Sequence, residues 1–373
     1  MDGSQPRNES PNEPQCQMMR IGVNALYLIP GGVGGTEIYL RNLLRGLSEI
    51  DAVNQYVVFT NRETGPDLVP DRPNFARAPQ PFHAAFRPAR IVWEQLVLPF
   101  ATRKHRIQVL LNPGFTAPLL CACPMVTVFH DLQHKRHPEY FRWFDLPFWN
   151  VFLWAAVRRS RGLIAVSQST ADDLERYYGR SARAIHPCVI HHGVEPEFFE
   201  IAQRREPGDY LLCVSTTHPH KNLQRLLRVH SQIKNPPRLV LTGVRGFAAG
   251  QIESLATASV ELTGWIPREQ LYELYRGALG FIYPSTFEGF GMPVLEAMAA
   301  GVPVACSDIP PLREIARSTV HFFDPSSDRE IRDALLLLAS GKLSTEPAQR
   351  RATDFSWEKA ARATLDYLSK CSS

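Results

Sequence analysis

Short apolar runs alternate with amphipathic patterns along nearly the whole chain. Between the runs, leucines recur at i, i+3, i+4 and i+7, as in 40–47, which is typical of one face of a helix. The runs that have the length and composition of buried strands lie at 20–26, 56–60, 108–111, 125–129, 162–166, 184–190, 210–214, 238–242, 260–262, 280–283, 302–306 and 320–323. This alternation predicts an α/β fold, with parallel sheets flanked by helices in both halves of the chain.

The length of the chain predicts two domains, because 373 residues exceed the usual size of a single hydrophobic core. The segment around Pro207 and Gly208 has no apolar periodicity and is the best candidate for an interdomain linker. The expected parts are a disordered polar tail at 1–17, a first domain at 18–195, a linker at 196–208, a second domain at 209–350 and a terminal segment at 351–373 that carries an amphipathic helix.

Composition narrows the class of protein. The formal charge of +4 is too weak to indicate nucleic acid, but it is compatible with anionic phosphate donors or an anionic membrane surface. Seven cysteines without a C-x-x-C pair or a spaced Cys/His ligand set predict reduced thiols, a cytoplasmic compartment and no metal. The first residues lack the pattern of a signal peptide.

The most informative motif is 287–301, where two carboxylates lie eight positions apart around a glycine loop that opens a helix. Pro293 suits the first helical position and Gly301 suits the C-terminal stop. Glu288 therefore falls in the loop and Glu296 in the first turns of the helix. One carboxylate could face a sugar while the other accepts hydrogen bonds from a ribose.

The loop between these carboxylates is suited to phosphate. Gly289 and Gly291, beside Phe290 and Met292, let the backbone approach a ligand closely, and free amides at a helix start attract anions. The plain alternative is an ordinary loop capped by an acid, with the second acid on a solvated face.

A second glycine cluster follows the first predicted strand and opens the first helix. Gly34 and Gly35 would lie at the carboxyl edge of the sheet, where ligands bind in open α/β folds. Because Glu37 occupies the third glycine position of G-x-G-x-x-G, an NAD site is disfavoured. A structural turn is the alternative.

Two further loops at strand ends carry candidate side chains. His130, followed by Asp131, can donate from one ring nitrogen and accept at the other, so it suits a sugar hydroxyl or a leaving phosphate. A structural histidine is the alternative. Lys221, in the loop that starts at Ser215, could supply the cation that a departing diphosphate needs.

Two aromatic features leave alternatives open. Trp265 and Ile266 follow another predicted strand and could hold a nucleotide base or belong to the core. The aromatic run 140–157 is too short and too polar to span a bilayer. It could form a core helix, or it could dock on an anionic membrane together with the arginines that follow it.

These residues resemble a known family. Glu288 and Glu296 with seven residues between them, followed by AMAAGVPV, are similar to the E-x7-E signature of retaining glycosyltransferases of family 4. The resemblance covers 20–369. It implies the GT-B architecture, in which two Rossmann-like domains face each other across a cleft, and a reaction without cofactor or metal. It also implies that the terminal helix crosses back onto the first domain.

The resemblance assigns roles to the candidate residues. It places the loop of Gly34 and Gly35 against the donor phosphates, His130 at the donor sugar with Asp131 orienting it, Lys221 at the diphosphate, the backbone of Trp265 and Ile266 at the base, Glu288 at the sugar and Glu296 at the ribose. Family members commonly pair an arginine with the lysine, but the stretch from Ser215 holds none. Arg225, Arg245 or a hydroxyl could replace it.

The pattern around His130 most resembles bacterial mannosyltransferases of polysaccharide assembly, which makes GDP-mannose the expected donor. The expected acceptor is a saccharide or a lipid-linked saccharide, the expected location is the cytoplasm or the inner face of the membrane, and no nucleic acid is expected. The alternatives are a sugar-nucleotide epimerase on the same architecture and a non-catalytic protein that binds nucleotide sugars.

Overall fold

The computed structural model describes residues 18–32 and 34–372, so the predicted tail at 1–17 lies outside the described residues. The first half forms a parallel sheet in the order β3-β2-β1-β4-β5-β6-β7. Its strands are β1 (Arg20–Asn24), β2 (Gln55–Thr60), β3 (Phe75–Pro79), β4 (Val109–Asn112), β5 (Met125–Phe129), β6 (Gly162–Ala165) and β7 (Cys188–Val189).

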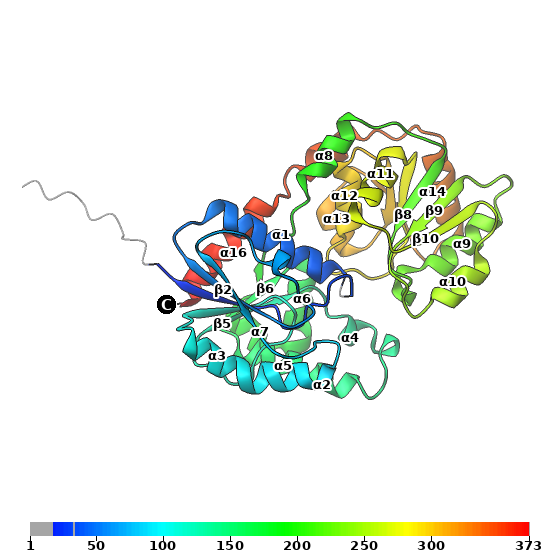
Figure 1. Cartoon of the computed structure of the whole chain (residues 1–373). Coiled ribbons are helices and arrows are strands. Elements are labelled where there is room, and N and C mark those ends of the chain that lie inside the picture. Colours follow the sequence, from blue (N-terminus) through cyan, green and yellow to red (C-terminus); the bar gives the residue numbers. More distant parts are fainter. Residues whose placement is uncertain (1–17, 33, 373) are drawn as a thin grey trace, which may run out of the picture.

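The second half forms another parallel sheet, in the order β10-β9-β8-β11-β12-β13. Its strands are β8 (Tyr210–Val214), β9 (Arg238–Thr242), β10 (Val260–Gly264), β11 (Gly280–Tyr283), β12 (Val304–Ser307) and β13 (His321–Phe323). In both sheets the strand order reverses beside the first strand, which is where open α/β folds bind ligands. The predicted α/β fold with two parallel sheets is confirmed, and Figure 1 shows the sheets in two lobes.

Helices cover both faces of the first sheet. One face packs against α1 (Gly35–Ile50) and α16 (Trp357–Ser372). The other face packs against a second apolar layer. The helices of that layer are α2 (Arg87–Val92), the π-helical turn Trp93–Val97, α3 (Leu98–Lys104), α5 (Leu146–Arg159), α6 (Gln168–Tyr178) and α7 (Arg180–Ile185). The short α4 (Gln133–Arg136) follows β5.

The second sheet is covered in the same way. One face packs against α9 (Leu223–Ser231), α10 (Ala249–Leu255) and α14 (Asp328–Ala339). The other face packs against a layer that is continuous with the α1–α16 core. Its helices are α8 (Pro196–Gln203), α11 (Arg268–Gly277), α12 (Met292–Ala299), α13 (Pro310–Ala316) and α15 (Glu346–Ala352). The two lobes therefore share apolar packing on one side.

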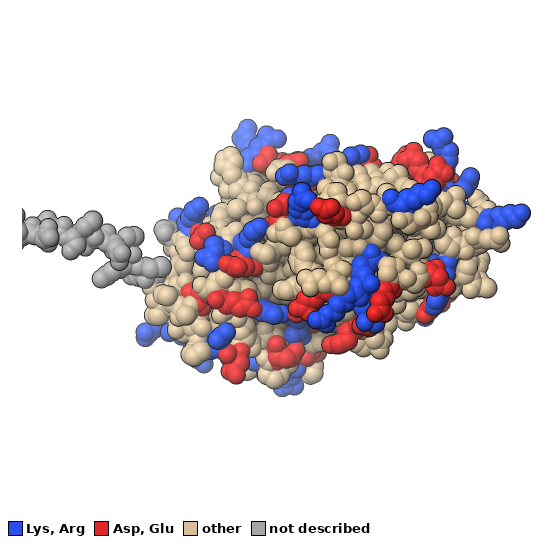
Figure 2. Space-filling model, turned by 90° about the horizontal axis from the view of Figure 1, so that it is seen from above, with Lys and Arg blue, Asp and Glu red and all other residues tan. Residues whose placement is uncertain are grey.

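The chain returns to its first lobe at its end. Helix α16 follows the second sheet in sequence but packs against α1 and beneath β4, β5 and β6. Gly46 permits this packing, because a Cβ there would lie 2.9 Å from the carbonyl oxygen of Trp357. Acidic and basic side chains are interspersed on the face that Figure 2 shows, so no field of one sign covers that side.

Several predicted elements need correction. The run 184–190 is not one strand, because it holds the end of α7 and only the short β7. The segment 196–208, expected to be a linker, contains α8, and α15 is a further helix between the second sheet and the terminal helix. The edge strand β3 was not predicted at all. Its burial pattern, with three exposed residues in five, explains why it lacks an apolar run.

Candidate active site

Loops from the two sheets meet between the lobes. Gly289, after β11, lies so close to the loop after β5 that a Cβ at this position would overlap the carbonyl oxygen of His130. Only glycine permits such an approach without moving one of the loops. The glycine loop and the histidine loop, predicted separately from the sequence, are therefore in contact.

A buried ion pair lies beside this contact. The Nζ of Lys221 donates to the Oε1 of Glu288 at 2.7 Å and to the hydroxyl of Tyr283 at 3.1 Å. Burial alone would raise the pKa of Glu288, but the charge and hydrogen bond of Lys221 outweigh burial and hold it below its usual value. The pair is therefore ionised, and a diphosphate entering here would compete with Glu288 for the ammonium group.

His130 is buried and neutral. Its Nε2 lies 2.8 Å from the carbonyl oxygen of Pro113, which can only accept, so Nε2 carries the proton and Nδ1 is an acceptor. Burial lowers the pKa of His130 to about 4. The ring of Tyr39 packs against the imidazole ring in a T-shaped arrangement, with the ring centroids 4.8 Å apart. His130 can thus accept a hydrogen bond from a sugar hydroxyl, but it carries no charge near neutral pH.

Asp131 does not orient this imidazole, contrary to expectation. Its Oδ1 accepts from the backbone N–H of Gln133 at 2.9 Å, whereas the recorded hydrogen bond of the His130 ring is to Pro113. Burial raises the pKa of Asp131, and the Glu288 charge adds to this effect. Asp131 therefore stabilises the turn of its own loop and does not orient the imidazole ring of His130.

Glu296 lies on the buried side of α12 and already has partners. Its Oε1 accepts from Arg268 at 2.9 Å and its Oε2 accepts from the hydroxyl of Tyr275 at 3.0 Å. Arg268 also donates to Glu195 at 2.7 Å, so one guanidinium joins two carboxylates. Burial raises the pKa of Glu296, while Arg268 acts in the opposite direction.

Arg268 and Glu195 were missed by the sequence analysis. Arg268 directly follows the predicted base-binding loop, which is the one signal that could have drawn attention to it. Glu195 precedes α8 and is also bonded to the hydroxyl of Tyr272. Both line a cavity of about 510 Å³ that is bounded on its other side by α1 and by 67–70.

The other predicted loops lie at the carboxyl edges of their sheets. Gly34, with a φ of 60°, precedes α1, and the carboxylate of Glu37 accepts from the N–H of Gly31 and so closes the turn. Trp265 is 63% exposed and is therefore not part of the core. Ile266 beside it is half-buried.

Both arginines that could replace the family's arginine beside Lys221 form ion pairs with acids in this structure. Arg225 forms an ion pair with Asp328, and Arg245 forms one with Glu253. The hydroxyl of Ser215 donates to the neighbouring backbone carbonyl. Among the residues that the structure describes, no group of three or more His, Cys, Asp or Glu side chains could hold a metal ion.

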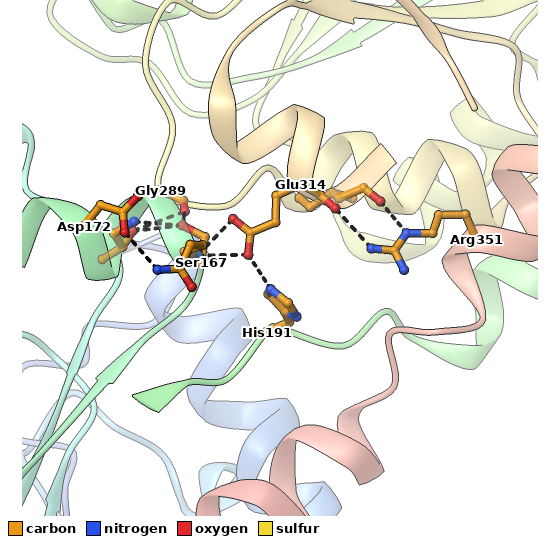
Figure 3. A network of polar contacts seen from close by, with 9 residues as sticks. Ser167, Asp172, His191, Gly289, Glu314 and Arg351 are labelled. Carbon is orange, nitrogen blue, oxygen red and sulfur yellow. Dashed lines mark hydrogen bonds and ion pairs between the residues drawn. The ribbon is translucent and has the colours of Figure 1, made fainter. Parts of the chain in front are cut away.

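A network of polar contacts holds the glycine loop to the first lobe (Figure 3). The hydroxyl of Ser167, at the start of α6, donates to the carbonyl of Gly289 at 2.6 Å. The carboxylate of Glu314, on α13, accepts from the N–H of Gln168 at 2.9 Å and lies 2.6 Å from the Nε2 of His191. Ser167, Gln168 and His191 belong to the first lobe, so these contacts bridge the two lobes beside Glu288.

Arg351 supports this network from behind. Its guanidinium donates to the carbonyl of Ile315 at 2.8 Å and to that of Glu314 at 3.0 Å, near the C-terminal end of α13. The positive charge suits that end of the helix, where carbonyl groups lack partners. The segment after the second sheet thus steadies the helix that carries Glu314.

Comparison with known proteins identifies relatives of both halves. Residues 33–198 match the family model described as Glycosyltransferase Family 4, and 194–354 match Glycosyl transferases group 1. The chain is 26% identical to O-antigen chain mannosyltransferase B of Escherichia coli, over 72% of this chain and 75% of that protein. It is 27% identical to O-antigen chain mannosyltransferase RfbU of Salmonella typhimurium, over 63% of each.

Solved structures show the same fold. Sucrose-phosphate synthase from Thermosynechococcus elongatus superposes with a TM-score of 0.76 at 17% identity, over 94% of this chain and 98% of that one. Anabaena Alr3699/HepE in complex with UDP and glucose superposes with a TM-score of 0.71 at 18% identity, over 94% and 100%. Both likenesses extend over the two lobes together.

Proposed function

Because the chain is a GT-B glycosyltransferase whose halves match the family 4 and group 1 models, we propose that it transfers a hexose from a nucleoside diphosphate sugar to a saccharide or lipid-linked acceptor. The buried pair of Lys221 and Glu288, beside the contact of Gly289 with His130, carries this proposal. Mannose from GDP-mannose is the proposed donor, since two relatives are named as mannosyltransferases.

The donor diphosphate takes the place of Glu288 at the ammonium group of Lys221. A charge-assisted hydrogen bond from a buried lysine stabilises the negative charge that grows on the leaving diphosphate. The start of α12 lies in the same loop, and the positive end of its dipole acts in the same direction. Lysine and the helix start supply this charge stabilisation in a reaction that we propose to proceed without a metal or cofactor.

The released carboxylate of Glu288 and the Nδ1 of His130 then face the sugar. Both accept hydrogen bonds from its hydroxyl groups and hold it in position. The bond between the anomeric carbon and the diphosphate breaks to give an oxocarbenium-like state. The acceptor hydroxyl attacks from the same face, and its proton passes to the leaving phosphate oxygen, so the anomeric configuration is retained.

At the other end of the donor, Glu296 accepts from the ribose and the backbone of Trp265 and Ile266 holds the base. Each carboxylate oxygen of Glu296 has one recorded donor, which leaves acceptor capacity for a ribose hydroxyl. The exposed ring of Trp265 is available for stacking. The loop of Gly34 and Gly35 approaches the diphosphate from the first lobe.

The proposal is tested by incubating the full chain with GDP-mannose, UDP-glucose or UDP-galactose in EDTA, with and without a mannoside acceptor. Release of GDP that depends on the acceptor is expected, with an α-linked product by NMR. Release of nucleotide and an altered sugar without acceptor would instead support an epimerase. Binding of donor without turnover across many acceptors would support a non-catalytic protein.

A further inference from the structure

Exposed apolar side chains are concentrated on one part of the first lobe. Of the sixteen large hydrophobic residues that are exposed among those described, ten lie within 86–106, 119–120 and 140–161. They are Phe86, Val92, Leu96, Phe100, Leu119, Leu120, Trp143, Phe144, Val151 and Trp154. Trp143 is 82% exposed, which is unusual for the largest apolar side chain and calls for an explanation.

The exposed residues form stripes on helices. Val92, Leu96 and Phe100 recur every four residues along the continuous helical segment formed by α2, the π-helical turn and α3. On α5, Val151 and Trp154 share a face, while the buried side is limited to Leu153 and 155–157. Helix α5 is therefore amphipathic: one side, with Leu153, Ala156 and Val157, belongs to the core, as the core interpretation expected, and the other side is exposed.

These segments form one surface. The guanidinium of Arg87, on α2, pairs with Asp145 at 2.5 Å and lies over the ring of Phe148 on α5. The backbone of Leu119 is bonded to the side chain of Gln95 in the π-helical turn. Figure 1 shows α2, α3 and α5 along the same side of the seven-stranded sheet. We call 86–106, 119–120 and 140–161 together the α2–α5 surface.

The α2–α5 surface is also strongly basic. Its segments hold nine Lys and Arg residues but only two Asp and Glu residues. The remainder of the chain holds thirty-two Lys and Arg residues and thirty-five Asp and Glu residues. Of the two acids, Glu94 is buried and Asp145 is paired with Arg87. Seven of the cations are exposed: Arg103, Lys104, Arg106, Arg142, Arg158, Arg159 and Arg161. The net charge of the chain thus arises on this surface alone.

One end of the surface reaches the candidate active site. Tyr140, three residues before Trp143, lies with its ring 6.2 Å from that of His220, next to Lys221. The Nε2 of Gln133, between His130 and Tyr140 in the chain, also bonds to the Nδ1 of His220. The segment from the histidine loop to the exposed aromatics is therefore short and anchored to both lobes.

We propose that the α2–α5 surface docks the enzyme on an anionic lipid bilayer, with the aromatic stripes at the headgroup level and the seven cations against lipid phosphates. Exposed aromatics between arginines are the chemistry that favours a membrane interface. No helix of the described residues is both long and apolar enough to cross a bilayer. The placement brings Tyr140 and the site close to the headgroup layer, which suits a lipid-linked acceptor.

The test is co-sedimentation of the full chain with vesicles of phosphatidylcholine alone or with 30% phosphatidylglycerol, roughly the charge of an anionic leaflet. Binding to the anionic vesicles alone is expected, and it should weaken with salt. Replacing Arg103 and Lys104 with Gln should lower the partition coefficient by about fivefold per charge. Trp143→Ser with Phe144→Ser should lower it by at least about tenfold.

Matched controls separate the surface from general effects. Leu96→Ser should weaken vesicle binding, whereas Leu336→Ser, at an exposed leucine on α14 outside the surface, should leave it unchanged. Arg350→Gln on α15 is the matched loss of an exposed charge. Transfer to a soluble acceptor should stay unchanged in all these variants, so failure of docking and failure of the proposed reaction are distinguishable.

Two results would overturn the proposal. Equal binding of wild type and the Trp143→Ser, Phe144→Ser variant to anionic vesicles would show that the stripes do not face the lipid. The other result is a concentration-dependent dimer that forms without vesicles and that these substitutions dissociate. It would show that a second copy of the chain covers the surface instead.

Discussion

At the scale of single residues, the site depends on two buried charges that have few other partners. Lys221 and Glu288 have only 14% and 10% of their side chains exposed, and each is the charged partner of the other. A lone buried charge is costly, so such a pair persists only while both members are present or a ligand replaces one of them. A diphosphate site requires such an exchange, in which the ligand replaces Glu288 as the partner of Lys221.

The roles of His130 and Glu296 predict different kinetic effects. Glu296→Ala should weaken donor binding and raise the KM for the donor about tenfold or more, because it removes contacts made equally in ground and transition states. His130→Ala should mainly lower kcat, because it loosens the sugar at the reacting centre. Steady-state kinetics with varied donor separate the two. Unchanged kinetics in both variants would remove the site assignment.

Buried histidines predict a pH dependence of stability. Burial lowers the pKa of both His130 and His134 to about 4, and it lowers that of His192 well below 6.5. Below pH 6.5 these histidines bind protons in the unfolded chain but remain neutral in the folded chain. The free energy of unfolding should therefore fall as the pH drops from 6.5 towards 4. Above this pH window the three histidines are neutral in both states and no longer lower the free energy of unfolding.

The measurement is the urea midpoint of unfolding at intervals from pH 7.5 to 4.5. His134→Gln should make the decline shallower, since one of the three histidines no longer titrates. A midpoint that stays constant from pH 6.5 to 5 would contradict the neutral, buried state of these rings.

At the scale of elements, the packing of α16 on α1 gives a sharp test. Gly46→Ala should destabilise the fold by about 1 to 3 kcal/mol, because the new methyl group would press on the backbone of Trp357. Gly250→Ala is the control: it is also helical but meets open space, so it should stabilise slightly, by up to about 1 kcal/mol. Thermal unfolding compares the two, and equal effects would argue against close contact of the helices.

The contacts between α13 and α6 predict a positioning role for Glu314. Glu314→Ala removes charge-assisted bonds to Gln168 and His191. If each lobe must hold the Gly289 loop for transfer, kcat/KM should fall about tenfold. Glu346→Ala, an exposed acid on α15, is the control. A melting temperature close to wild type with reduced kcat/KM is expected, whereas unchanged kinetics would show that these contacts do not matter for turnover.

The sequence was most informative where function depends on a strand followed directly by a loop. The apolar runs located β5, β8 and β11, and the residues that follow them in sequence are His130, Ser215 to Lys221 and Glu288. The helix α8 was missed because its segment was judged to lack apolar periodicity, although Pro196 fits the first turn of a helix.

Contacts between distant residues could not be predicted in this way. Arg268 lies 73 positions from Glu195, and Gln168 lies 146 positions from Glu314. Periodicity reports which face of an element is buried, but not which polar side chains meet across two lobes. For the same reason the aromatic run of α5 could be identified from the sequence, whereas the stripe on α2 and α3 that extends it could not.

At the scale of the whole molecule, two sheets present their carboxyl edges to one another and share one continuous apolar core. This arrangement holds loops from both lobes against each other at Gly289, so the donor would be gripped from two sides. The central claim is that Lys221, beside this contact, binds the diphosphate of the donor.

Calorimetric titration of GDP in EDTA into wild type and Lys221→Met tests this claim most directly. Lys342→Met, at an exposed lysine, is the control, and Lys221→Met with Glu288→Gln guards against misfolding from an unpaired carboxylate. The account predicts that Kd rises at least about tenfold in both Lys221 variants and stays constant in the control. Wild-type affinity for GDP in folded Lys221→Met would contradict it.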